Sequence, residues 1–250
     1  MTLSKLLCLC VLAFTLLGCG AGPTPRLIHL VGKEAFESQE LSSKNGEWLR
    51  VPTIGLVVHA DDTAQNSAPA IISRYLETLT RRTETFLRQR CAFQDIVTVP
   101  PFPPAVNFSQ ELKVQGQSLH VPYVIVVVLS SREKTGPVTI GEATMMTQMS
   151  GTGIENSALA EVGILRLSDF QLVYWTQGRG FESLEQLDVP IGKNRPSAIE
   201  ARDLLRAGAG QQALDRALEH VGTACQPVAK PRLAVTGSFQ IADRVRSPVL

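Results

Sequence analysis

The tetrapeptide His-Ala-Asp-Asp at residues 59–62 is the part of the chain that most resembles a reactive centre. It ends an apolar run, and alternate residues of a strand project to one side, so His59 and Asp61 could share a metal ion or a proton. A catalytic zinc site takes three protein ligands, and no third ligand is evident. The competing interpretation is a loop whose aspartates favour the start of the next helix.

Residues 131–136, Ser-Arg-Glu-Lys-Thr-Gly, contain two signatures of serine enzymes that act on peptidoglycan or β-lactams, namely Ser-x-x-Lys and Lys-Thr-Gly. Both signatures use Lys134, although in those enzymes they lie on separate elements. One lysine in one loop cannot fill both positions, so we treat the match as coincidental. Residues 151–156, Gly-Thr-Gly-Ile-Glu-Asn, are predicted to turn the chain between strands, and they lack a phosphate-binding pattern. No cofactor and no enzymatic activity are expected.

Cys19 is the strongest chemical signal in the sequence. Lys5 supplies a positive charge, and residues 6–17 are apolar apart from Thr15. A membrane-spanning helix needs about 20 apolar residues, so this shorter run is typical of a secretory signal instead. The ending Leu-Leu-Gly-Cys at residues 16–19 resembles the bacterial lipoprotein box.

That resemblance implies a diacylglycerol on Cys19, cleavage after Gly18 and acylation of the new amino terminus. Several acyl chains would form an effectively permanent membrane anchor. In a Gram-negative cell, Gly20 in place of aspartate implies export to the outer membrane, with the protein on the periplasmic face. The alternative is an ordinary signal peptide in which Cys19 is incidental.

Two cysteines remain once Cys8 and Cys10 leave with the leader and Cys19 is lipidated. Cys91 and Cys225 each lie at the end of a predicted helix. In an oxidising compartment they are candidates for a disulfide, and the alternative is two unpaired buried thiols.

The rest of the chain must position these residues. We expect a signal peptide at 1–18, a polar tether at 19–50 with a brief strand near its middle, an α/β domain at 51–226 and an extended tail at 227–250. Within the domain we predict a helix from Ser67, as its N-cap, to Cys91 and a helix from Ser197 that Gly208 and Gly210 interrupt. Strands are predicted at 51–60, 94–100, 120–131, 137–149, 157–167 and 170–177, with a proline-rich loop at 100–109.

This order of elements predicts an α/β fold: a two-layer sandwich with a mixed, mostly antiparallel sheet and two main helices. The apolar run at 123–129 predicts a central strand that is covered on both faces.

The first main helix carries five arginines against two glutamates. They could face anionic lipid headgroups, lipopolysaccharide or an acidic partner, and the competing interpretation is a solvated helix face. The arginines are Arg74, Arg81, Arg82, Arg88 and Arg90.

Charge gives no argument for nucleic acid as a partner. The 24 Lys and Arg residues exceed the 23 Asp and Glu residues by one, and Lys5 lies in the leader. The layout at 51–225 resembles small α/β domains of envelope lipoproteins, and the segment from Tyr123 through Leu-Val-Tyr-Trp-Thr-Gln-Gly-Arg-Gly is similar to the rhombotail lipoproteins. The resemblance implies a non-catalytic binding or assembly-accessory module with an envelope protein partner. The rival hypothesis is an envelope hydrolase or metal-dependent enzyme that uses His59 and Asp61.

Overall fold

The computed structural model describes residues 22–37, 46–91, 93–100, 102, 107–140, 149–187 and 198–225. The strands are β1 (Thr53–Asp61), β2 (Asp95–Thr98), β3 (Tyr123–Ile140), β4 (Met149–Arg166) and β5 (Gln171–Leu187). The helices are α2 (Leu27–Val31), α3 (Glu34–Glu37), the 3-10 helix η1 (Glu47–Arg50), α5 (Ser73–Arg90), α6 (Phe108–Ser118) and α7 (Ala198–Cys225).

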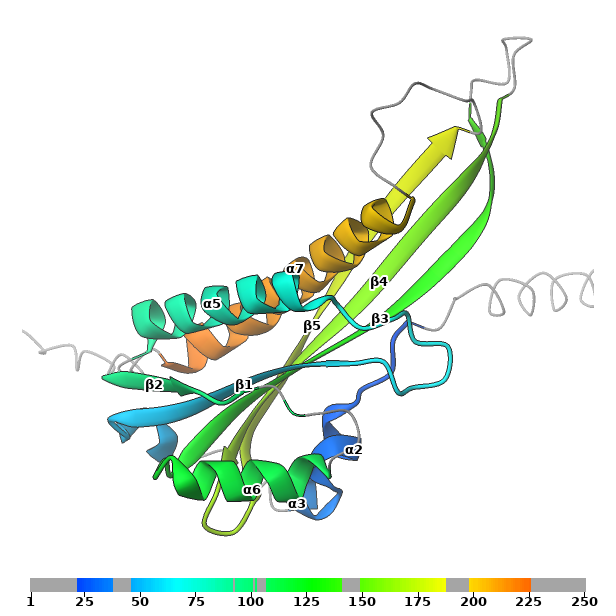
Figure 1. Ribbon diagram of the computed structural model, residues 1–250. Coiled ribbons are helices and arrows are strands. Elements are labelled where there is room, and N and C mark those ends of the chain that lie inside the picture. Colours follow the sequence, from blue (N-terminus) through cyan, green and yellow to red (C-terminus); the bar gives the residue numbers. More distant parts are fainter. Residues whose placement is uncertain are drawn as a thin grey trace, which may run out of the picture.

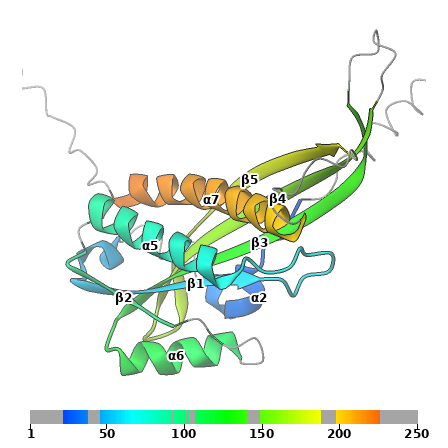
Figure 2. The same ribbon diagram turned by 45° about the horizontal axis from the view of Figure 1, so that its top comes forward.

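The strands form one five-stranded sheet in the order β2-β1-β3-β4-β5 (Figure 1). β1 pairs in parallel with β2 and β3, whereas the long pairs β3–β4 and β4–β5 are antiparallel. The prediction of an α/β fold with a mixed, mostly antiparallel sheet is confirmed. The two predicted main helices, α5 and α7, lie side by side on one face (Figures 1 and 2).

The core occupies both faces of the sheet, and β3 shows why its sequence is apolar throughout. Its alternate residues Ile125, Val127 and Leu129 face the core under α5 and α7. Val124, Val126 and Val128 point the other way into a second apolar cluster under α2 and α6. A central strand with apolar layers on both sides cannot show the polar alternation of a half-exposed strand.

The short helices α2, α3 and α6 lie against the face opposite α5 and α7 (Figure 1). Part of the segment predicted as a tether therefore belongs to the domain: Leu27 and Trp48 are buried in the two cores. The brief strand expected there is instead the helix α2. A five-residue helix is too short to show apolar periodicity, and Leu27 becomes buried only because the sheet supplies its neighbours.

Helix α6 was also missed, because the prolines before it favoured a loop. The side chain of Asn107 accepts a hydrogen bond from the backbone N–H of Gln110 at 3.3 Å and caps the helix. Phe108 and Leu112, one turn apart, then insert into the second core. The sequence signal was therefore an N-cap followed by apolar residues at helical spacing.

Both main helices differ from their predicted courses. α5 begins at Ser73 with Ile72 as N-cap, because the backbone N–H of Ala68 donates to Ser131 at 2.8 Å and holds the preceding segment against β3. α7 runs without a break through Gly208 and Gly210, since packing against the sheet stabilises it there. Ser197, the predicted cap of α7, lies outside the described residues.

The sheet continues beyond its core as a projection that we call the β arm: residues 131–137 of β3, 153–157 of β4 and 179–184 of β5. β1 ends at Asp61, opposite Ser130, so β3 has β4 as its only strand partner in the described part of the arm. The segments 131–136 and 151–156, predicted as loops, are paired strands here. Polar composition misled the prediction, because an arm outside the core does not need apolar side chains on both faces.

Candidate functional site

The segment that enters the domain is held by a buried carboxylate. Glu161, in the middle of β4, is 1% exposed. Its carboxylate accepts hydrogen bonds from the backbone N–H groups of Arg26 and Leu27, the latter at 3.0 Å. These two N–H groups lie at the N-terminus of α2 and have no acceptor within the helix itself, and negative charge is favourable at this end of a helix. Glu161 therefore fixes the position at which the chain joins the sheet.

Asp61 holds the same segment through a side chain. Its carboxylate accepts a hydrogen bond from Arg26 Nε at 2.5 Å and from Thr63 Oγ1 at 2.7 Å. Burial on its own would raise the pKa of Asp61, but the bonds from Arg26 and Thr63 and the charge of Arg26 outweigh burial and bring the pKa below its ordinary value. The geometry gives Asp61 a structural partner, which the sequence did not reveal.

His59 lies one pleat away but does not join this ion pair. Its ring packs on Phe108 with the ring centroids 5.3 Å apart. Burial lowers the pKa of His59, although Asp61 and Asp62 act in the opposite direction. Within the described ranges, no three His, Cys, Asp or Glu residues are grouped so that they could hold a metal ion. The proposed sharing of a metal or proton by His59 and Asp61 finds no support in these contacts.

The substitution Asp61→Asn is expected to lower the free energy of unfolding by about 2 kcal/mol at neutral pH, because it breaks an ion pair whose carboxylate is buried. Because the pKa of Asp61 is lower in the folded protein than in the unfolded chain, its charged carboxylate stabilises the fold at pH values above the ordinary pKa of 3.8. This stabilisation disappears as the pH falls through the folded-state pKa of Asp61. The wild type should therefore approach the variant in acid. Urea unfolding as a function of pH measures the difference. The exposed neighbour serves as the control, since Asp62→Asn should change little; equal effects of both substitutions would contradict this role.

The arginines of α5 do not form one free basic face. Arg82 makes a bidentate ion pair with Asp215 of α7, with distances of 2.7 and 2.8 Å. Arg88 contacts Glu84 at 2.9 Å and Asp95 at 3.5 Å. Arg82 therefore ties α5 to α7, a role that the spacing of charges along α5 could not show.

The remaining three arginines differ from this pair. The guanidinium of Arg74 lies over the ring of Tyr75, 4.7 Å from its centroid. Arg81 and Arg90 are exposed and form no ion pair with the described residues. Two separate cations therefore remain for an external partner on this helix.

A groove of about 630 Å³ runs beside Arg81, between α5, Val58 of β1 and the end of β2. Val58 and Leu76 contribute apolar wall, while Glu77, Arg81 and Glu84 contribute charge. No pattern in the sequence indicates this groove, because β1, α5 and the segment after β2 come together only in the folded chain.

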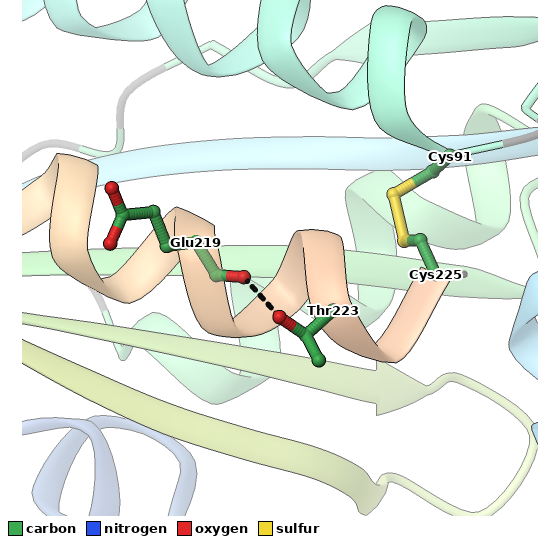
Figure 3. The surroundings of a disulfide bond; sticks show 4 residues. All are labelled: Cys91, Glu219, Thr223 and Cys225. Atoms are coloured by element: carbon green, nitrogen blue, oxygen red, sulfur yellow. Dashed lines mark hydrogen bonds between the residues drawn. A yellow bond between two sulfur atoms is a disulfide. The ribbon is translucent and has the colours of Figure 1, made fainter.

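Cys91 and Cys225 are joined by a disulfide, with their Cα atoms 5.1 Å apart (Figure 3). Cys91 follows the last residue of α5, and Cys225 is the last residue of α7. Beside the bond, Thr223 Oγ1 donates to the carbonyl of Glu219 at 3.0 Å within α7 (Figure 3). The covalent link fastens the two main helices at one end.

Cys19, the predicted lipidation site, lies outside the described residues. The chain becomes described at Gly22, which with Pro23 lines a cavity of about 380 Å³ beside Ser130 and Arg132 of β3. The chain thus enters the structure at the base of the β arm. No described helix is long and apolar enough to span a membrane.

No family model matches this chain, and no curated protein matches it. Solved structures with a partly similar arrangement include a putative neuraminyllactose-binding hemagglutinin homolog from Helicobacter pylori, with 9% identity, a TM-score of 0.37, and coverage of 71% of this chain and 87% of that chain. The minor lipoprotein from Acinetobacter baumannii has 10% identity and a TM-score of 0.33, over 71% and 96% of the two chains. The rare lipoprotein B from Shewanella oneidensis has 13% identity and a TM-score of 0.26, over 68% and 94%. Bacterial lipoproteins thus recur among the similar structures.

Proposed function

We propose that this chain is a lipid-anchored cell-envelope protein with a non-catalytic binding or assembly-accessory role, on the periplasmic face of the outer membrane of a Gram-negative cell. The observation that carries the proposal is the sequence Leu-Leu-Gly-Cys at residues 16–19, directly after an apolar leader. Acyl chains on Cys19 would each contribute about 0.8 kcal/mol per buried methylene to membrane binding. Gly20 at the next position favours the outer membrane.

The disulfide supports an envelope location. Cys91 and Cys225 are bonded in the structure, and such bonds persist in oxidising compartments such as the periplasm.

A non-catalytic binding role is supported by the residues that were candidates for catalysis in the sequence, because the structure gives them structural contacts. Asp61 is occupied by Arg26 and Thr63, and His59 packs against an aromatic ring. Lys134, shared by the two serine-enzyme signatures, lies on β3 opposite Glu155 of β4. No further observation favours the rival hydrolase or metal-dependent enzyme.

We assign the binding of the partner to the exposed side of α5 around Arg81 and Arg90, which we call the α5 face. The outer edge of β5 is less suited to bind an added strand. The backbone N–H of Phe181 donates to Gln212 at 3.4 Å, and the backbone carbonyl of Arg179 accepts from Arg216 at 2.5 Å. Side chains of α7 thus occupy groups that an added strand would need. The exposed Arg81 and Arg90 suit acidic side chains of an envelope protein. The adjacent groove, whose wall includes Val58 and Leu76, suits its apolar side chains.

Labelled fatty acid is expected to enter the wild-type protein in growing cells, and the labelled protein should fractionate with the outer membrane. The variant Cys19→Ala should lose the label and leave the membrane fraction while it still folds, because residue 19 precedes the packed segment. Cys8→Ala is the matched control and should remain labelled. Label on Cys19→Ala would refute the anchor.

The same cells test the binding role. A photo-crosslinking amino acid in place of Arg81 should give an adduct with an envelope protein, whereas the same group in place of the exposed Gln117 of α6 should not. Equal crosslinking from both positions would contradict the assignment of the α5 face.

A further inference from the structure

The two faces of the β arm differ in what covers them. In β5, Gly178 and Gly180 face α7, since a Cβ atom at either position would meet the backbone of that helix. Strand alternation therefore turns Arg179 and Phe181 to the opposite face. Only one face of the arm rests on α7 in the described structure.

The other strands contribute to the same uncovered face. Val124, Val126 and Val128 of β3 face α2 and α6, and the alternation continues to Arg132 and Lys134. In β4, Glu161 faces α2, so Glu155 and Ser157 share its side. The pairing brings Arg132, Ser157 and Phe181 into one row across the arm, and Lys134, Glu155 and Ser183 into the next.

The uncovered face is basic and carries an exposed aromatic ring. Three of its side chains are cationic, and Glu155 is the acidic member among the residues whose side chains are described. Phe181 is 52% exposed. The cations are Arg132, Lys134 and Arg179. Basic side chains beside an aromatic ring suit the interface of a bilayer with anionic lipids, where cations meet headgroups and the ring meets the boundary of the acyl chains.

The length of chain before Gly22 limits how far a lipidated Cys19 can lie from this face. Gly22 and Arg132 line the same cavity at the base of the arm. Two residues separate Cys19 from Gly22, and the three steps from Cα to Cα span at most about 11 Å when fully extended. Arg26 and Leu27 are held on this side of the sheet by Asp61 and Glu161, which limits how far the domain can move from its anchor.

We propose that the uncovered face of the β arm lies against the membrane that holds Cys19, with Arg132, Lys134 and Arg179 on anionic lipid headgroups and Phe181 in the interface. This inference rests on the proposed function, because it requires the anchor. With this face against the membrane, α5 and α7 point away from the bilayer toward an envelope partner.

The test uses the full lipidated chain in phosphatidylethanolamine vesicles with and without phosphatidylglycerol. A nitroxide label is placed on Ser183→Cys, on the uncovered face, or on Gln211→Cys. Gln211 is exposed on α7, next to the residue that contacts β5 at the level of Phe181, and it serves as the matched control. With phosphatidylglycerol present, the label at 183 should be protected from a water-soluble nickel chelate, while the label at 211 stays accessible.

Charge reversal tests the electrostatic part. Each cation near an anionic surface favours binding about fivefold, so the loss of two cations in Lys134→Glu with Arg179→Glu should by itself lower the membrane-apposed population about 30-fold relative to the free-standing one, and the two added carboxylates should lower it further. The label at 183 should then become as accessible as the label at 211. Arg81→Glu with Arg90→Glu makes the same change of charge on α5 and should leave the label at 183 protected.

The outcomes separate this inference from the proposed function. If the protein is lipidated and bound to vesicles but the labels at 183 and 211 are equally accessible, the orientation is wrong and the anchor stands. Protection at 183 that appears only after envelope extract is added would also overturn it, because a protein would then cover the face. A chain that carries no lipid and does not bind vesicles would instead refute the proposed function.

Discussion

The substitution Gly180→Ala is expected to lower the free energy of unfolding by about 3 kcal/mol, because it forces apart α7 and β5. A Cβ atom at residue 180 would lie 2.0 Å from the carbonyl oxygen of Ala209 and 2.7 Å from the backbone nitrogen of Ala213. Both are backbone atoms of a helix, so neither can turn aside as a side chain would. Gly178 makes the equivalent approach one pleat earlier, 2.1 Å from the carbonyl oxygen of Ala213.

The close approach depends on small residues from both elements. Ala209, Ala213 and Ala217 recur every four residues along α7 and are fully buried. They form a flat stripe that lies on the two glycines of β5. A shift of α7 would also break the bonds from Arg216 to the carbonyl of Arg179 and from the N–H of Phe181 to Gln212. The disulfide at Cys225 restrains the helix from sliding along the strand, so the added methyl group cannot be accommodated cheaply.

Chemical denaturation followed by circular dichroism measures the effect. Gly136→Ala is the matched control, since Gly136 also lies in a strand of the arm but has no atom within 4 Å of the added Cβ. It should be neutral or slightly stabilising, because alanine restricts the unfolded chain more than glycine does. A Gly180→Ala protein as stable as Gly136→Ala would show that α7 does not pack on β5 this closely.

The second large effect concerns the disulfide. Replacing Cys91 and Cys225 together by alanine is expected to cost about 5 kcal/mol, because the bond closes a loop across a sequence separation of 134 residues. An open chain of this length has many more unfolded conformations than a chain closed into a loop. By excluding those conformations, the disulfide lowers the entropy of the unfolded state and so stabilises the fold. The loss of stability should affect the ends of α5 and α7 first, where Leu87 and Val221 contribute to the core beside the disulfide.

Guanidinium unfolding of the double alanine variant and of the reduced wild type provides the measurement. The two should unfold at similar denaturant concentrations, and the variant should not respond to the reductant. If reduction leaves the unfolding of the wild type unchanged, then either the bond is absent in the purified protein or the reference state is already restricted, and the stability assigned to it would be wrong.

These stability effects bear on the proposed role. An arm that is rigidly backed by α7 presents a fixed face on one side, and the disulfide holds α5 against α7 on the other. An anchor close to Gly22 would place this rigid body near the membrane rather than at the end of a long tether, because residues 22–37 pack on the sheet. The binding surface on α5 would then face outward at a defined height.

Several parts of the protein could be predicted because their signals are local. The leader with its Leu-Leu-Gly-Cys ending is a linear pattern of charge, apolar length and small residues. The strands β1 and β3 are apolar runs, and α5 shows helical periodicity. Each property is visible within a single segment, so the α/β class and the two main helices followed from the sequence.

Other features required partners that are distant in the chain. The sequence does not indicate that Glu161 caps a helix, because Arg26 and Leu27 lie far from it along the chain. Asp61 likewise resembles a reactive carboxylate in the sequence, and only the folded chain brings Arg26 into contact with it. The arm could not be predicted, since polar and glycine-rich strands lose their apolar pattern once they leave the core.

The sequence by itself therefore determined the anchor motif, the two cysteines available for pairing and the order of the principal strands and helices. The tertiary structure alone decided that residues 22–37 join the domain, that Gly178 and Gly180 receive α7, and that α7 covers one face of the arm while no other described element covers the opposite face. The physical reason is that periodicity and propensity act between neighbours in the chain. Burial, close backbone approach and the pairing of a buried charge depend instead on residues that only folding brings together.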